Sequence, residues 1–119
     1  MAYYQQAVNE HVGDVAFWEA LFIYFFSPKG HNEECLYSLQ QYEALAKDQK
    51  PEDLQKFGHC LKVWQGWLFD LLGRRDEAIK CYQEVLQNFK GPHGYCTQVD
   101  RKWLEEHIKT PFKLAEIGL

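Results

Sequence analysis

Apolar side chains recur along this chain at steps of three and four residues, the spacing that lines up one face of an α-helix. The longest series lies between Pro51 and Gly73 and consists of Leu54, Phe57, Leu61, Trp64, Leu68 and Leu71. No segment shows a convincing alternation of apolar and polar residues, which a half-buried β-strand would require. The spacing therefore predicts an all-α protein.

Residues that cap or interrupt helices divide this pattern into segments. Asp14 is placed to cap an apolar helix that ends at Ser27, Pro28 and Gly30, because its carboxylate can accept hydrogen bonds from the free N–H groups of the first turn. Pro51 suits the start of a later helix, since that position needs no backbone N–H donor. Further helices are expected over about 32–47, 51–72, 74–89 and 97–109.

Size and charge limit the class of partner. The chain has 119 residues and a 46% hydrophobic content, which is enough for one small domain with its own core. Its formal net charge is −4, with the basic residues scattered among acids, so no nucleic-acid partner is expected. The longest apolar run, residues 15–26, contains Glu19 and falls short of the roughly 20 residues that cross a bilayer. We therefore expect a soluble, cytoplasmic protein with no membrane partner.

The four cysteines support the same expectation. The four are Cys35, Cys60, Cys81 and Cys96, which lie far apart without paired spacing. Three of the four fall within apolar helical patterns. This distribution favours reduced, buried thiols over the disulfide framework of a small secreted domain.

Three segments resemble one another. They read YYQQAV at 3–8, SLQQYE at 38–43 and CYQEVL at 81–86, so the copies start 35 and then 43 residues apart. When the segments are aligned in this way, a turn glycine is followed by a packing residue after five positions and by a larger one after nine. These residues are Gly30, Cys35 and Leu39 in one copy, and Gly73, Ala78 and Tyr82 in the next. A glycine turn followed by a small residue favours two antiparallel helices in close contact.

This arrangement resembles the tetratricopeptide repeat (TPR), a helix-turn-helix unit of about 34 residues. The resemblance is best over residues 61–89, where the matching positions are Gly66, Phe69, Gly73, Ala78 and Tyr82. It implies a single domain, 1–119, of TPR-like antiparallel helical hairpins stacked as a short solenoid. Its parts would be a remnant or cap helix at 1–13, hairpins at 14–47 and 51–89, and a C-terminal capping helix at 95–110.

Proteins of this family usually bind peptides or protein segments in a groove lined by the first helix of each pair. Carried over by position, the groove residues here would be Phe17, Ala20 and Tyr24 from one unit, and Cys60, Val63, Trp67 and Asp70 from the next. Such a face favours an apolar or amphipathic helix, because it lacks the basic side chains that clamp carboxylates. The resemblance thus implies a protein-interaction module or adaptor with Trp67 at its centre. The alternative is that the chain's own termini cover these aromatic residues.

Catalysis is not expected, because the chain has no phosphate-binding loop and no nucleophile or metalloprotease motif. No cofactor is expected either. The remaining alternative is a small zinc-stabilised or enzyme-associated helical domain, with a candidate ligand set of Cys81, His93, Cys96 and His107. Self-association is a further hypothesis, because the first helix has no polar cap to cover Tyr3, Tyr4 and Val8.

Overall fold

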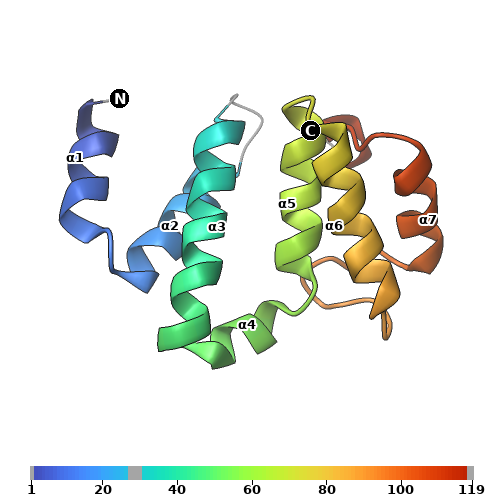
Figure 1. Ribbon diagram of the computed structural model, residues 1–119, viewed down its shortest axis with the longest axis horizontal. Helices are drawn as coiled ribbons and strands as arrows, with labels where there is room; N and C mark the ends of the chain where they lie inside the picture. The colour runs from blue at the N-terminus through green and yellow to red at the C-terminus, as the bar shows by residue number, and fades with distance from the viewer. Residues whose placement is uncertain (1, 27–30, 118–119) are drawn as a thin grey trace.

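The computed structural model describes residues 2–26 and 31–117, and this part of the chain is helical without a β-strand (Figure 1). The all-α prediction is therefore confirmed. The elements are α1 (Ala2–His11), α2 (Val15–Phe25), α3 (Asn32–Gln49), α4 (Pro51–Phe57), α5 (Cys60–Leu71), α6 (Arg75–Gln87), α7 (Arg101–Lys109) and a short 3₁₀ helix, η1 (Leu114–Ile117).

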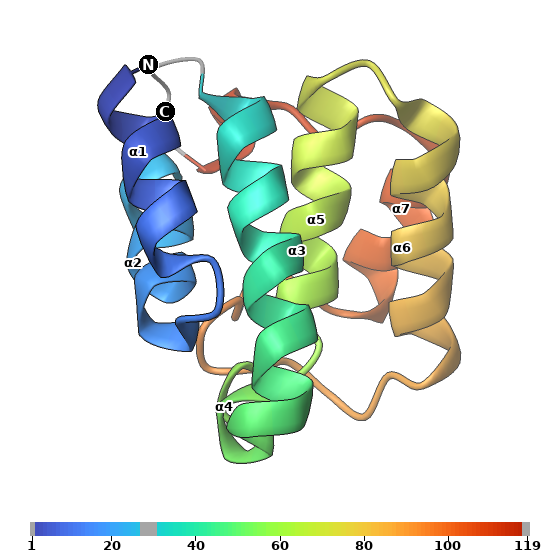
Figure 2. The same cartoon turned by 60° about the vertical axis from the view of Figure 1, so that its left-hand side comes forward.

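Two antiparallel helix pairs form the centre of the molecule. Helix α2 packs against α3, and α5 packs against α6 (Figures 1 and 2). The pairs meet where α3 contacts α5, while α7 lies on the outer side of α6. No helix in the described residues is long and apolar enough to span a bilayer.

The start of α2 follows the sequence expectation. Asp14 is the N-cap residue, and its carboxylate accepts hydrogen bonds from the backbone N–H groups of Ala16 and Phe17, at 3.0 and 3.4 Å. This satisfies two donors that the first helical turn would otherwise leave free. The expected turn residues Ser27, Pro28 and Gly30 lie outside the described part of the chain.

The expected single helix between Pro51 and Gly73 is wrong, because the structure divides it into α4 and α5. Gly58 ends α4 with a φ of +56°, a conformation that breaks the helix and that glycine adopts without steric penalty. A Cβ at this position would lie 2.8 Å from Cδ2 of His93. The apolar periodicity continues across the break, so helical spacing alone does not predict where α4 ends.

The contact between α5 and α6 agrees with the predicted packing. Ala78 and Tyr82 are fully buried, and a Cβ added to Gly66 would lie only 2.5 Å from Cε1 of Tyr82. Gly73, with a φ of +76°, sits in the turn that joins the two helices. Gly66 therefore makes room for the tyrosine ring where the helices approach most closely.

The last helix begins later than expected. Asp100 caps α7 by accepting a hydrogen bond from the Trp103 N–H at 2.7 Å, so residues 97–100 are a turn instead of the first helical turn. Val99 is fully buried, and the Trp103 ring meets Tyr82 edge to face at 5.4 Å. Through these residues the segment packs against α6.

Candidate functional site

An apolar pocket of about 420 Å³ lies between α2, α5 and the segment that precedes α7. Its lining residues are Phe22, Ile23, Phe26, Trp64, Trp67, Tyr95 and Gln98. Six of these seven side chains are aromatic or aliphatic, and Gln98 supplies an amide. The volume lies within the range of pockets that bind small ligands, and such pockets are also predominantly apolar.

Aromatic rings from α2 and α5 build the walls. The Trp64 ring lies 6.3 Å from that of Phe22 and 6.2 Å from that of Phe26, centroid to centroid. Tyr95 packs against Phe57 from the side of the 88–100 segment, and Ile23 is 57% exposed on α2. An exposed aliphatic residue beside partly buried aromatic rings marks a surface suited to apolar contact.

Trp67 is part of this pocket but is mostly covered by the protein itself. Its ring stacks on that of Phe112, at 4.6 Å and 6° between planes, and the residue is only 4% exposed. Its indole N–H is buried and has no hydrogen-bond partner among the described residues. The alternative that the C-terminal segment covers Trp67 thus holds for one face of the ring.

The other residues predicted to line the groove differ widely in solvent exposure. Val63 and the Asp70 side chain are completely buried, Tyr24 is 75% exposed, and Ala20 is exposed. Phe17, partly buried, packs against Trp18 and His11. Of the seven residues predicted to line the groove, which include Cys60, only Trp67 lines the pocket.

The side chains that do line the pocket carried only a weak signal in the sequence. Trp64 belongs to the apolar series between Pro51 and Gly73, and Phe22 and Phe26 lie in the apolar run 15–26, so helical spacing gives none of them a distinct role. Ile23 lies in the same run and has no polar or charged group that would single it out. Periodicity identifies an apolar helix face, but it does not tell which part of that face a neighbouring helix leaves open.

Asp70 holds several elements together. Its carboxylate accepts two hydrogen bonds from the Arg75 guanidinium at 3.0 and 3.2 Å, one from the Tyr82 hydroxyl at 2.7 Å and one from the Phe112 N–H at 2.9 Å. The other arm of Arg75 donates to the His107 carbonyl at 2.6 Å. These partners occupy the carboxylate that the sequence assigned to a binding groove, so Asp70 is committed to internal contacts.

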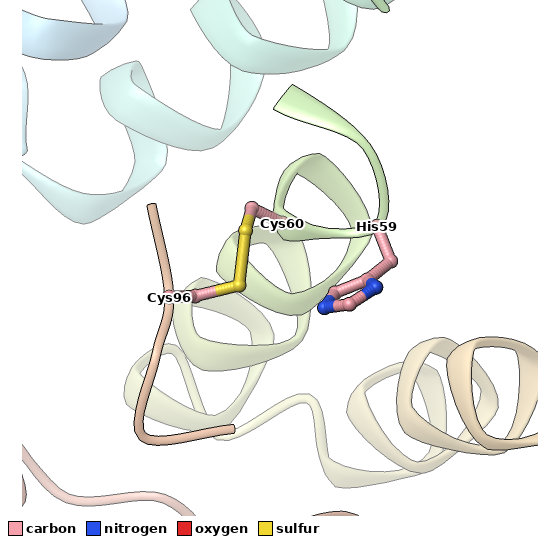
Figure 3. Close-up of side chains that lie close together, drawn as sticks. All are labelled: His59, Cys60 and Cys96. Atoms are coloured by element: carbon pink, nitrogen blue, oxygen red, sulfur yellow. A yellow bond between two sulfur atoms is a disulfide. The ribbon is translucent and has the colours of Figure 1, made fainter. Parts of the chain in front are cut away.

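The expectation of four reduced thiols is wrong. Cys60 and Cys96 form a disulfide with their Cα atoms 6.0 Å apart (Figure 3). Cys35 and Cys81 are free and buried, and burial raises their thiol pKa values to about 12 and about 11. The cytoplasmic expectation assumed four reduced cysteines, and only Cys35 and Cys81 are free thiols in the structure.

The zinc ligands proposed from the sequence are not brought together. Cys96 is paired with Cys60, and Cys81 lies in α6. His107 is engaged on both ring nitrogens, by the Trp103 carbonyl at 2.7 Å and the Glu116 carboxylate at 2.6 Å. A site made of Cys81, His93, Cys96 and His107 is not formed.

A different group of potential ligands surrounds the disulfide. A ring nitrogen of His59 and the sulfurs of Cys60 and Cys96 all lie within 4.8 Å of one another (Figure 3). The Nε2 atom of His59 is buried and has no hydrogen-bond partner among the described residues. Burial, assisted by the neighbouring His93, lowers the His59 pKa, so the imidazole is neutral at physiological pH.

Comparison with known proteins identifies no relative: no family model, no curated protein and no solved structure matches this chain. The TPR resemblance consequently remains a prediction made from the sequence.

Proposed function

We propose that this protein is an interaction module that binds the apolar face of a helical segment from a protein partner. The pocket between α2 and α5 is the proposed binding site, and its aromatic lining is the observation that carries the proposal. An amphipathic helix presents large apolar side chains at three- and four-residue steps, which suits a pocket of about 420 Å³ lined by rings. The protein's net charge of −4 favours a partner whose polar face is basic.

The arrangement of helices supports the same proposal. We infer that the pairs α2/α3 and α5/α6 are consecutive units of a short TPR-like solenoid, with α7 covering its end. In such a stack the first helices of successive pairs border a shared surface, and here those helices are α2 and α5. The site differs from the one predicted by repeat position, because it uses Ile23, Phe26 and Trp64 in place of Tyr24, Val63 and Asp70.

A selection from a library of helical peptides tests the proposal. Selected peptides should carry large apolar residues at helical spacing, and their dissociation constants can be measured by calorimetry. The variant Ile23→Glu should weaken binding at least tenfold, because it places a charge at the apolar rim. Val12→Glu is the matched control: Val12 is 58% exposed, like Ile23, but lies in the turn before α2 and should leave binding unchanged.

Two outcomes would contradict the proposal. The first is a selection that yields no peptide with saturable binding. The second is equal binding by the two glutamate variants, which would place the interaction elsewhere. A third variant, Gln98→Trp, fills the pocket from its polar side and should also weaken binding without adding a charge.

A further inference from the structure

Two short sequence segments that are far apart in the chain meet at the beginning of α5. One is the pair His59–Cys60, and the other is the turn from His93 to Cys96, whose ends are joined by a hydrogen bond from the Cys96 N–H to the His93 carbonyl at 3.0 Å. Together they bring two sulfurs and an imidazole nitrogen within 4.8 Å of one another. The His93 ring lies beside them, 5.8 Å from that of His59 between centroids.

The His59 ring contacts Phe89, with centroids 5.4 Å apart, but no hydrogen bond accounts for the position of its Nε2 atom. His59 is the N-cap residue of α5, yet its side chain makes no capping hydrogen bond. Its Nε2 is buried without a hydrogen-bond partner in the described residues, a state that normally destabilises a folded protein. A buried, unpartnered imidazole nitrogen next to two sulfurs is a set of donors that suits a metal ion.

We propose that His59, Cys60 and Cys96 form a zinc site when the Cys60–Cys96 disulfide is reduced. A thiol or phosphine reductant supplies two electrons and is itself oxidised, the S–S bond breaks, and two protons convert the sulfurs to thiols. Zinc then binds both sulfurs as thiolates and releases those two protons to solvent. The His59 imidazole donates its Nε2 lone pair, and a fourth position stays open for water or another ligand.

The three proposed ligands suit zinc, and their chemistry explains why the metal would bind only to the reduced protein. Two thiolates and one imidazole are a known zinc ligand combination, with a fourth position left for another ligand. Cys60 is the first residue of α5, where the positive end of the helix dipole stabilises a thiolate. The same two sulfurs cannot be both bonded to each other and bound to a metal, so oxidation would expel the ion.

The proposal is tested on the full chain with cobalt(II), which reports thiolate ligands and tetrahedral geometry by its absorption. The protein is reduced with a phosphine, and the opening of the disulfide is verified by a gain of two alkylated cysteines in the mass of the denatured chain. The reduced protein should then bind one cobalt(II) per chain with thiolate charge-transfer bands, and zinc should displace it. The oxidised protein should give no such bands.

Variants identify the ligands. His59→Ala should weaken metal binding by at least tenfold, whereas His31→Ala should not change it. His31 is the matched control because it is also an N-cap residue without a capping side-chain bond, at the start of α3. Cys60→Ser should abolish the charge-transfer bands, and Cys81→Ser should preserve them.

The proposal is overturned if the reduced chain binds no cobalt, or if the two histidine variants bind it equally. Should reduction unfold the protein, helical circular dichroism provides the second measurement. Zinc added to the reduced chain should then restore the helical signal, and no recovery would equally overturn the proposal. None of these readouts depends on peptide binding, so this site and the proposed pocket fail or succeed independently.

Discussion

At the scale of single residues, Asp70 shows that helical spacing alone does not predict whether a side chain belongs to a binding site. It follows Val63 and Trp67 at helical steps, and a carboxylate at such a position is usually exposed. The structure buries it completely, because Arg75, Tyr82 and the Phe112 N–H surround its oxygens. The arginine is only five residues away, but the contact with residue 112 depends on how the C-terminal segment folds back. Periodicity holds no information about that contact.

Tyr82→Phe should lower the free energy of unfolding by about 1 to 3 kcal/mol. The change keeps the ring that packs on Gly66 but leaves the buried Asp70 carboxylate with one donor fewer. Tyr24→Phe is the control, since Tyr24 is exposed on α2 and should tolerate the loss of its hydroxyl. Urea unfolding of the two variants gives the comparison. Equal effects would mean that the Tyr82 hydroxyl does not stabilise the buried carboxylate.

At the scale of helices, most of the architecture was predictable. Apolar spacing located the helical segments, Asp14 marked a start, and Gly73 marked a turn, because each of these signals acts through the local backbone. The break at Gly58 was not predictable, since the apolar series runs through it unchanged. Its cause is tertiary in part: the His93 ring occupies the space next to the glycine.

Three glycine-to-alanine variants separate the two causes. Gly58→Ala should destabilise the protein most, because it combines a φ of +56° with a Cβ 2.8 Å from the His93 ring. Gly73→Ala has a φ of +76° but open space, and should lose about 1 to 2 kcal/mol from the strained backbone alone. Gly13→Ala meets nothing within 4 Å and should be close to neutral. Thermal unfolding of the three variants should show the largest loss of stability for Gly58→Ala, a smaller loss for Gly73→Ala and almost none for Gly13→Ala. Any other ranking would contradict this explanation of the helix break at Gly58.

At the scale of the whole molecule, the candidate pocket and the disulfide share one structural element. The segment between α6 and α7 carries Tyr95 and Gln98 to the pocket and Cys96 to α5. Neither feature was predictable from the sequence, because a connection without helical periodicity gives no indication of where it packs. The disulfide consequently fixes the position of a segment that also forms one wall of the pocket.

Replacing both bonded cysteines, as Cys60→Ala with Cys96→Ala, should lower the free energy of unfolding by about 4 kcal/mol beyond the loss of the sulfur atoms themselves. The reason is that the disulfide joins residues 36 positions apart and restricts the unfolded chain. The matched control is Cys35→Ala with Cys81→Ala, which removes two buried sulfurs without removing a cross-link. Both double variants should be unfolded with urea without a reductant, so that the Cys60–Cys96 disulfide stays closed in the control. A difference below about 1 kcal/mol between the double variants would show that the cross-link does not determine the stability of this fold.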